Sequence, residues 1–587
     1  MEKVKLKIGG EDYSTSFSAV QIQQDLGWHH YIEIRLPLAD TTQKFKGVLN
    51  KTSKDLIGKA LEISFNGNKF RGLVTGVALR RVRRQENELV VTGGSPTLVM
   101  DEGPDTVSFY EQTLKQIADN LINKYTSYFK KVTISPQAKE KIKYIVMYKE
   151  STFEFLNRIA AQFGEWFYFD GEEIFFATKP IRQGDKVRNL YQDKNLLHFD
   201  LSVKATPVNF KLSGYDYKQH HYLQEESSYN LKMNEFAKIA FDKSQSELYK
   251  NRTQVPVHSS LSKVDLGLLK DLRERITVTE MVVLSGSSTD EMLRPGSFVH
   301  LLDERTDLIG TTEDYGEYIL THVEHNFGKG GENYFNAFEA VPLEVDVPPF
   351  VSPLDAPYCE MQLADIVENN DPDALGRVRV QFLWQRGTDQ KSPWIRMGSP
   401  FSGKDKGFYI IPEKGDQVLV AFENNSPNRP YVLTGLYNGE AKPENHQSEN
   451  YLKSIKTSGG NVILMNDEKG KESFGITSPK DVSIDGASGK ITITSKEVIT
   501  IQSQGDSIKL ECPATITIHS KDLIFIADSK ISLKAPMIES IAETEFKTTS
   551  PTINIEAIET STIKGGLNVN IDGIVATNIS GGTIKLN

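Results

Sequence analysis

The sequence predicts a mainly β protein: a β-rich base with a few helices, a small OB-type barrel, and a triangular β-helix needle made of three chains. Three observations predict this fold. Short stretches that alternate apolar and polar residues recur along the chain, separated by Gly, Pro, Asn and Asp. Capping-box motifs open helical patterns within the base. The last part of the chain repeats an apolar–polar–apolar unit at a short and nearly constant period.

The composition excludes several classes of protein. Over 587 residues the formal charge is only -10, which argues against nucleic-acid binding. No run of eighteen apolar residues occurs, and the amino terminus lacks the apolar centre of a signal peptide. Cys359 and Cys512 lie far apart, so a disulfide framework is excluded and synthesis in a reducing cytoplasm is expected. Any export then bypasses the general secretory route.

Residues 1–345 are predicted to form the base. Most of their strand patterns alternate at a period of two, as a half-buried sheet requires. The basic cluster 80–84 is interpreted as the solvated side of a strand, because acidic residues follow it at once. Strands are expected at 3–8, 31–36, 61–65, 89–92, 166–169, 294–301 and 318–325.

Capping boxes mark the helices of the base, because a Ser at the start and a Glu three residues later satisfy the first backbone amides. Ser108–Glu111 precedes an amphipathic pattern at 114–125, and Ser151–Glu154 opens a helix that Gly164 ends. A third helix is expected at 266–275. The aromatic residues just after Gly164 are interpreted as a strand core packed beneath the helix.

Neighbouring histidines raise the hypothesis of a metal site in the base. His322 and His325 flank Glu324, but residues three apart on a strand face opposite sides of the sheet. The adjacent pairs His29–His30 and His220–His221 fail the same geometric test. No metal ion or other cofactor is therefore expected.

A proline-rich linker at 346–358 is predicted to separate the base from a second domain. The stretch 345–357 holds four prolines in thirteen residues, a density that resists both helix and sheet. Beyond it, residues 359–440 form a compact β unit whose short strands suggest a closed OB-type barrel. Such barrels can bind oligonucleotides, but acidic neighbours dilute the basic and aromatic residues here, so a structural barrel is favoured. Strands are expected at 361–367, 377–384, 394–397, 408–411, 417–422 and 430–434.

A neck at 441–489 is predicted to lead into a needle at 490–587, whose apolar units recur every seven to nine residues. No Arg or Trp occurs from residue 430 onward, so the needle packs almost wholly with Ile, Val and Leu. Strands this short need partners, from a single-chain β-helix or from other copies. Single-chain coils are usually longer, so one strand per eight residues favours three chains around a triangular prism. About thirteen crossings at ~4.8 Å give a rod on the order of 60 Å long.

Several motifs of the base and barrel support a family resemblance. They lie at 150–169, 293–296 (Leu-Arg-Pro-Gly), 318–325, 334–342, 371–384, 392–396, 411–420 and 428–430. With this order of domains and motifs, the chain resembles the valine-glycine repeat protein G (VgrG) family. These proteins are the spikes of bacterial type VI secretion, and they are related to the hub and needle of contractile phage tails. The base is shorter than the proteobacterial pattern and diverges from it, which suggests a non-proteobacterial member.

The resemblance implies a homotrimer whose phage-hub-like base, with two β-barrel subdomains and helical insertions, sits on an Hcp-like tube protein and the baseplate. It also implies a PAAR-repeat tip protein at the blunt end of the needle, effectors as cargo, and contact with a target membrane only by mechanical puncture. Assembly in the bacterial cytoplasm and ejection without a signal peptide follow. A tail spike of a prophage or of an extracellular contractile injection device is the alternative interpretation.

The tip protein is expected at the carboxyl-terminal end, because end strands expose unpaired backbone groups. The last histidine is His519, so a metal-binding tip within the needle is not expected, and neither is a toxin after it. The residues predicted to bind the tip protein are Ile579, Ile584, Lys585, Leu586 and Asn587.

A β-helix can also be a polysaccharide-degrading enzyme, which needs paired carboxylates or a basic residue in a groove. The acidic residues of the repeat lie scattered between the apolar units, as on a solvated surface, and no Gly-X-Ser-X-Gly motif occurs among them. The sequence therefore predicts no catalytic residue and a protein that is not an enzyme. The carboxylates considered are Asp481, Asp485, Glu497, Asp506, Glu511 and Asp522.

Overall fold

The computed structural model describes residues 4–38, 45–81, 87–177, 187–259, 263–304, 312–349, 357–487 and 489–585. The chain forms two compact units, residues 1–479 and 480–587, and this boundary lies inside the predicted neck. The basic cluster 80–84 and the linker 346–358 lie partly outside the described residues, as do Leu586 and Asn587. Among the helices that are described, none has the length and apolar character needed to span a bilayer.

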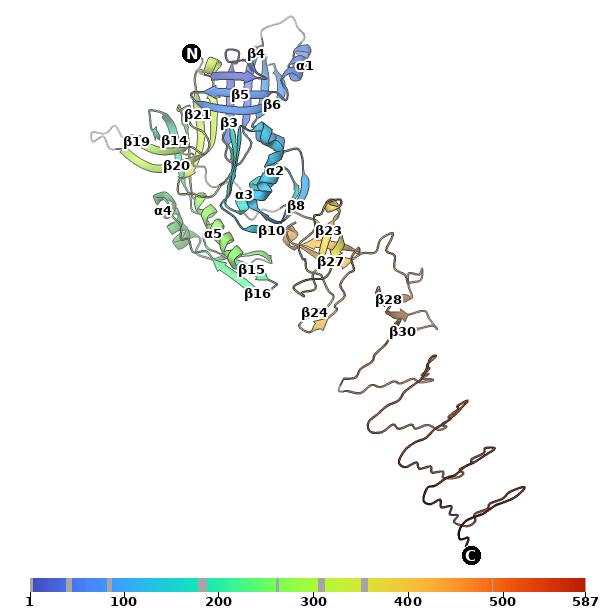
Figure 1. Ribbon diagram of the computed structural model, residues 1–587. Coiled ribbons are helices and arrows are strands. Elements are labelled where there is room, and N and C mark those ends of the chain that lie inside the picture. The colour runs from blue at the N-terminus through green and yellow to red at the C-terminus, as the bar shows by residue number, and fades with distance from the viewer. Residues whose placement is uncertain are drawn as a thin grey trace. The chain divides into compact units, whose positions relative to one another are not determined.

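Most strands of the base belong to one sheet of thirteen strands (Figure 1), which confirms the mainly β fold. Hydrogen-bonded neighbours follow the order β14-β18-β21-β20-β3-β4-β7-β6-β5-β1-β2, and β19 pairs with both β13 and β20. The strands are β1 (Val4–Ile8), β2 (Glu11–Asp12), β3 (Ala19–Asp25), β4 (Tyr31–Leu38), β5 (Ala60–Phe65), β6 (Asn68–Arg80), β7 (Asn87–Gly94), β13 (Arg188–Tyr191), β14 (Leu196–Val203), β18 (Val282–Ser288), β19 (Phe298–Glu304), β20 (Thr312–Phe327) and β21 (Phe335–Pro342).

The long strand β20 joins the two halves of this sheet. It pairs antiparallel with β3, so Val323 lies opposite Gln24, and also with β21, where Val323 lies opposite Phe338. The strand expected at 294–301 begins four residues later than predicted, because the chain turns at Gly296, whose φ of 82° favours glycine. The helix α1 (Phe45–Leu56) lies between β4 and β5 and has no counterpart in the sequence prediction.

A segment of mixed helices and strands, residues 105–177, follows the first half of the sheet. It contains β8 (Asp105–Thr113), α2 (Leu114–Ile122), β9 (Lys131–Ser135), β10 (Lys141–Glu150), α3 (Thr152–Gln162), β11 (Trp166–Phe169) and β12 (Glu173–Ala177). The helix α3 begins with the predicted capping box: the Glu154 amide donates to Ser151 Oγ at 3.1 Å, and the Ser151 amide donates to Glu154 Oε2 at 2.8 Å.

The other capping-box prediction is wrong in its position. Ser108–Glu111 lies within β8, whose pairing with β10 continues to Thr113 opposite Lys141. The helix α2 starts after Thr113, which forms its own capping box with Gln116. Both sequences satisfy the motif, and pairing with β10 decides that the later one is used.

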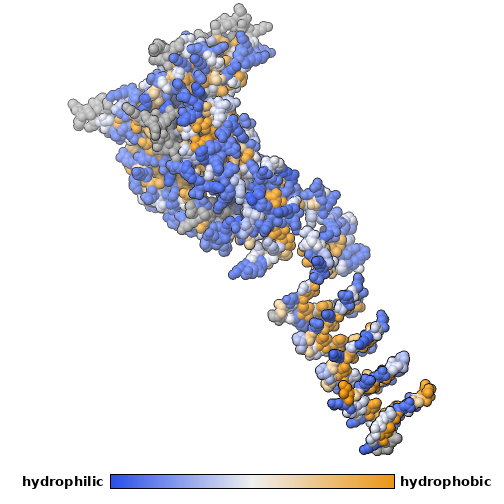
Figure 2. Space-filling model, in the orientation of Figure 1, coloured by the Kyte–Doolittle hydropathy of each residue, from blue (hydrophilic) through white to orange (hydrophobic). Residues whose placement is uncertain are grey.

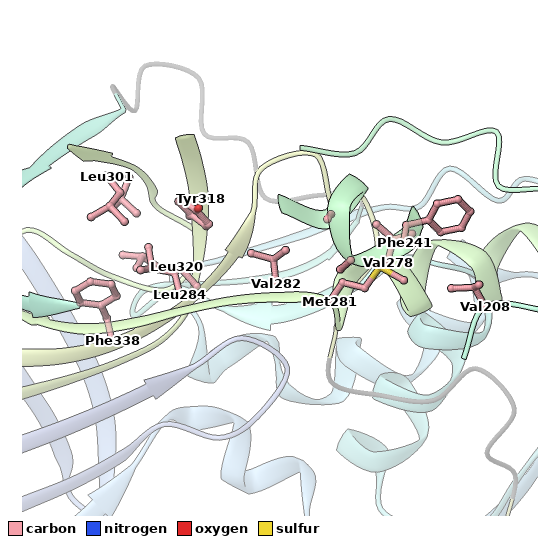
Figure 3. Close-up of a cluster of buried hydrophobic side chains, with 14 of the residues drawn as sticks. Val208, Phe241, Val278, Met281, Val282, Leu284, Leu301, Tyr318, Leu320 and Phe338 are labelled. Atoms are coloured by element: carbon pink, nitrogen blue, oxygen red, sulfur yellow. The ribbon is translucent and has the colours of Figure 1, made fainter. Parts of the chain in front are cut away.

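The core of the second half of the base lies between the sheet and two helices, α4 (Glu235–Lys243) and α5 (Lys263–Thr279). Figure 3 shows Phe241 of α4 and Val278 of α5 beside Met281, with the sheet residues Leu284 and Phe338 farther along the same cluster. The helix expected at 266–275 is confirmed as part of α5. A three-stranded sheet, ordered β16-β15-β17, flanks these helices: β15 (Phe210–Asp216), β16 (His221–Glu226) and β17 (Thr253–Ser259).

The small barrel is built on a sheet ordered β23-β22-β26-β27, with an added hairpin β24–β25. Two of its expected strands are not formed. Residues 394–397 make only single bridges, from Ile395 to Val378 and from Met397 to Val432, and 408–411 has no strand partner. The strands are β22 (Gln362–Glu368), β23 (Arg379–Phe382), β24 (Ser402–Gly403), β25 (Lys406–Gly407), β26 (Gln417–Phe422) and β27 (Pro430–Gly435).

The first unit ends in a three-stranded antiparallel sheet, the neck sheet, formed by β28 (Leu452–Lys456), β29 (Val462–Asn466) and β30 (Ser473–Thr477). Beyond it, the described part of residues 481–585 contains no strand. This second unit winds as a repeating spiral of extended runs joined by bends (Figure 1). The predicted short strands are therefore extended runs without partners in their own chain.

Candidate functional site

The repeat segment, residues 480–585, is the candidate functional element. Its conformation is regular, but a single chain supplies neither partner strands nor cover for its apolar side chains. Its bends recur every seven to nine residues, for example at 496–497, 504–506, 513–514, 521 and 528–529. One apolar pair lies between each two of these bends, as in Ile499 and Ile501 or Ile516 and Ile518. The structural period therefore equals the period of the sequence.

Serine side chains stabilise several of the bends. The Glu497 amide donates to Ser495 Oγ at 3.2 Å, and the Gly505 amide donates to Ser503 Oγ at 3.3 Å. A Ser hydroxyl that accepts from the amide two residues later is a common way to hold a turn. The bends are thus specified locally, residue by residue.

The apolar side chains of the repeat segment are uncovered. Ile499 is 49% exposed, Ile518 57% and Ile526 88%. Soluble proteins seldom expose contiguous apolar patches of more than a few hundred Å², and here the exposure extends over the whole described segment. Figure 2 shows open space between successive coils, with apolar residues along them.

Within the described part of the repeat segment, the extended runs have almost no backbone partner in their own chain. In the described part of residues 481–585, one backbone–backbone hydrogen bond is found, from the Gly489 amide to the Gly486 carbonyl. Backbone amides and carbonyls are paired in nearly all folded proteins, so the extended runs need partner strands. The carboxylates considered for catalysis, from Asp481 to Asp522, are all exposed along this spiral.

The predicted tip-binding residues lie at the end of the spiral, as far as they are described. Ile579 is 62% exposed and Ile584 49%, and Lys585 is exposed as well. Leu586 and Asn587 lie outside the described residues. The placement of the tip protein stays a prediction.

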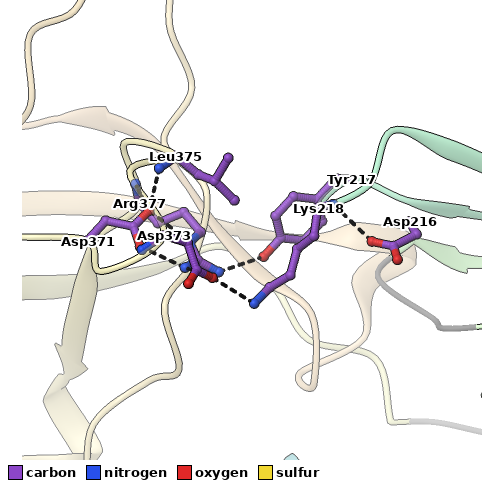
Figure 4. A network of polar contacts seen from close by, with 7 residues as sticks. All are labelled: Asp216, Tyr217, Lys218, Asp371, Asp373, Leu375 and Arg377. Atoms are coloured by element: carbon purple, nitrogen blue, oxygen red, sulfur yellow. Dashed lines mark hydrogen bonds and ion pairs between the residues drawn. The ribbon is translucent and has the colours of Figure 1, made fainter.

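A buried ion-pair network joins the barrel to the β15–β16 hairpin of the base (Figure 4). Arg377, only 2% exposed, donates to both carboxylate oxygens of Asp371, at 2.9 and 2.7 Å, and to Asp373 Oδ2 at 2.6 Å. Across the joint, Lys218 Nζ donates to Asp373 Oδ2 at 2.9 Å, and Arg377 also reaches the Tyr217 hydroxyl at 3.4 Å. The buried Arg377–Asp371 pair thus lies within one turn of the barrel, and a half-exposed ion pair connects that turn to one hairpin tip of the base.

The network lowers the pKa of both of its carboxyl groups. The Arg377 guanidinium, together with backbone amides of the same turn, holds the pKa of the Asp371 carboxyl well below its usual range. Lys218 and Arg377 likewise lower the pKa of Asp373. Sequence reasoning quoted the Asp371–Arg377 stretch only as a family motif and missed the hairpin partners, because nothing near Tyr217 and Lys218 signals that they face the barrel.

The barrel also packs directly on β10. Tyr144, Val146 and Tyr148 of β10 share one buried cluster with barrel residues such as Val380 and Val420. The Val146 amide donates to Asn428 Oδ1 at 2.8 Å, and Gln362 Nε2 donates to the Tyr148 hydroxyl at 2.8 Å. The base and the barrel therefore form a continuous packed body.

The histidines of β20 have structural partners. His322 Nδ1 lies 2.7 Å from Asp25 Oδ1, and this hydrogen bond raises the pKa of His322. His325 is fully buried between the Tyr334 hydroxyl at 2.8 Å and Gln24 Oε1 at 3.2 Å, and burial lowers its pKa to about 3. Within the described residues, no group of three His, Cys, Asp or Glu side chains is placed to hold a metal ion.

Sequence comparisons match the chain to known families in two places. The phage tail baseplate hub family matches residues 47–331, and the type VI secretion system/phage-baseplate injector OB domain matches residues 362–437. Along the chain, the match to a baseplate hub thus precedes the match to an injector OB domain.

The chain is also similar in sequence to proteins of type VI secretion and to related toxins. The chain is 24% identical over 412 residues to the actin cross-linking toxin VgrG1 of Vibrio cholerae, covering 64% of this chain and 36% of that protein. It is 32% identical over 168 residues to the type VI secretion system spike protein VgrG4b of Pseudomonas aeruginosa, covering 26% of this chain and 20% of that protein. These matches support the resemblance of the chain to VgrG spike proteins. The chain spans about a third or less of the length of these two relatives.

Among solved structures, the Escherichia coli c3393 protein, a component of the type VI secretion system, aligns with 74% of this chain and 99% of its own. The TM-score is 0.49 and the sequence identity is 15%.

Proposed function

We propose that this protein is the spike of a type VI secretion machine, in which three chains wind their repeat segments into one needle. The observation that carries this proposal is the repeat segment itself: regular extended runs with uncovered apolar side chains and unpaired backbone. Three chains, each crossing one face of a triangular prism in turn, would pair every run and bury every apolar row.

The work of such a spike is mechanical. A closed ladder leaves no free edge to unravel under compression, and a dry core of Ile and Val resists deformation. The base would dock on an Hcp-like tube protein and the baseplate, and a PAAR-repeat tip protein would cover the far end. The trimer is assembled in the cytoplasm and ejected through a target envelope with its effectors. No catalytic step by this chain is part of the proposal.

The mass of the purified full-length chain tests the three-chain needle. Light scattering is expected to give three times the mass of one chain, and a monomer would overturn the proposal. Incubating the pure protein with a panel of polysaccharides tests whether it is an enzyme. Turnover of any of them would contradict the spike proposal and favour a polysaccharide-degrading enzyme.

A tail spike of a prophage or of an extracellular injection device is the second candidate, because the matched OB family includes phage-baseplate injectors as well as type VI secretion proteins. The two candidates differ in their neighbours rather than in the geometry of this chain. Genes for type VI membrane-complex and tube proteins beside this gene favour secretion, whereas a phage structural operon favours a tail spike.

The placement of the tip protein is tested separately by removing residues 579–587. End strands with unpaired backbone groups are the natural acceptors for a partner. The shortened chain is expected to remain trimeric but no longer to bind a purified PAAR-repeat protein in a pull-down experiment. Tip binding that survives the deletion would move the site elsewhere on the needle.

A further inference from the structure

The neck sheet carries one face that is apolar and open. Ile455 pairs opposite Ile463, which in turn pairs opposite Ile476, and Met465 pairs opposite Phe474. Residues directly opposite each other on antiparallel strands share one face, so these five side chains lie together. Lys453, which pairs opposite Met465, lies at the edge of the same face and forms an ion pair with Asp467. Phe474 is 66% exposed, Ile476 54% and Ile455 46%. We call this set the neck face.

The other side of the same sheet is different. Lys456 forms an ion pair with Glu444, and Asn445 Nδ2 donates to Ser454 Oγ at 2.8 Å, so the segment before β28 reaches over this side. On β30 this side presents Ser473, Gly475 and Thr477. Its apolar residues, Leu452, Val462 and Leu464, are partly buried. The open side of the sheet is therefore also its most apolar side.

Such a sheet is not stable in isolation. Three strands of five residues each need an apolar partner to cover one face. We propose that the neck face packs against the neck faces of two further copies of this chain and sets the register of the three repeat segments. This inference rests on the three-chain spike proposed above.

Chain continuity points to further copies as the occupant. The repeat segment starts at Lys480, three residues after β30 ends at Thr477, and three residues span at most about 11 Å. Three chains that wind together from this point must bring their neck sheets to the same axis. Just after this point in the sequence, Val482, 55% exposed, and Ile484, 72% exposed, are uncovered as well.

Register is the problem that the neck sheet solves. Successive runs of the repeat segment look alike, so a chain displaced by one run would still place apolar side chains opposite apolar side chains. The neck sheet does not repeat, and its strands pair within their own chain, so its three copies fit together at one height only. Packing at the neck thus selects one register for the whole needle.

The test places charge on each side of β30 in the full-length chain. The double variant Phe474→Lys with Ile476→Lys is expected to convert the trimer to monomers, or to trimers displaced in register. The matched control, Ser473→Lys with Thr477→Lys, changes the same strand on its other side and is expected to remain an in-register trimer. Light scattering gives the mass.

Register is read at Cys512, which is exposed, whereas the other cysteine, Cys359, is buried. Pyrene attached to Cys512 forms an excimer when the three chains lie at the same height. The wild type and the control are expected to show excimer emission, and the neck-face variant is expected to lose it. Full trimer mass with full excimer emission in the neck-face variant would overturn the inference, as would a wild-type trimer without excimer.

A disulfide test does not depend on whether the charged variant folds. In a Cys512→Ser background, oxidised Phe474→Cys is expected to link two chains, and Thr477→Cys is expected not to. A trimer without the link at position 474 overturns the neck packing and leaves the spike intact. A monomeric wild type removes the proposed function itself, so the two failures are distinguishable.

Discussion

The base and the repeat segment use the same alternation of apolar and polar residues and reach opposite outcomes. In the base, Leu284, Tyr318 and Leu320 are fully buried, because neighbouring strands and helices of the same chain cover them. In the repeat segment, Ile518 and Ile526 are more than half exposed on runs of the same pattern. Alternation predicts that a strand has an apolar face, but it does not say which chain covers that face.

The largest expected effect comes from charging the uncovered rows. The double variant Ile516→Lys with Ile518→Lys places lysines where three chains would pack, and a buried unpaired charge is strongly unfavourable. Light scattering is expected to show a complete loss of trimer, while thermal unfolding of the base is unchanged. Thr515→Lys with Thr517→Lys, on the alternate positions of the same run, is the control and should remain trimeric. Equal loss in both variants would contradict the assigned inner face.

In the base, where the same chain covers the apolar side chains, a core substitution is expected to lower stability and leave the trimer intact. Phe338 is 2% exposed in the core of the base, and Phe338→Ala should lower the free energy of unfolding of the base by about 3–5 kcal/mol. The trimer mass should not change, because the repeat segment holds the chains together. Phe335→Ala on the same strand, where Phe335 is 45% exposed, is the matched control and should cost far less. Denaturant titration with a base-specific probe measures both.

The sequence predicted what depends on local pattern. The Ser151 capping box, the period of the repeat segment and most strands of the sheet follow from residues close together in the chain, and the structure has them. The Ser108 box failed because Thr113 and Gln116 satisfy the same motif five residues later, and only pairing between β8 and β10 decides between them. Tertiary contacts, rather than the local motif, therefore decide where α2 begins.

Long-range contacts could not be predicted in this way. The Arg377 network depends on a hairpin 160 residues upstream. The neck face depends on the register of three short strands, of which the sequence pattern showed no sign. Only the Arg377 network is long-range: it lies at the joint between base and barrel, where position in space rather than local sequence sets the contacts. The neck sheet is local, but its short strands gave no recognised pattern.

The Arg377–Asp371 pair extends the comparison to charges, because the chain itself buries both partners. Arg377→Met leaves the Asp371 carboxylate buried without its partner, which should destabilise the barrel by about 3–5 kcal/mol at neutral pH. Arg386→Met, which breaks the more exposed pair with Asp365, is the control and should have little effect.

The effect of Arg377→Met should depend on pH in a defined direction. The pKa of Asp371 is lower in the folded state than its ordinary value of about 3.9, so its pairing stabilises the fold at higher pH. That stabilisation declines as the pH falls below about 4 toward the folded-state pKa. The difference in unfolding free energy between wild type and variant should therefore be full at pH 7 and narrow in acid. A difference that stays constant down to pH 3 would show that Arg377 acts by packing alone.

The smallest expected effect lies in the same network at the surface. Lys218 and Asp373 are each about half exposed, so water and salt screen their ion pair even though the atoms lie 2.9 Å apart. Lys218→Met should shift the melting temperature of the base by no more than about one degree, and added salt should remove even that difference. A large, salt-insensitive shift would mean that Lys218 holds the buried Asp371–Arg377 pair in place. The joint would then depend on the hairpin as much as on the barrel turn.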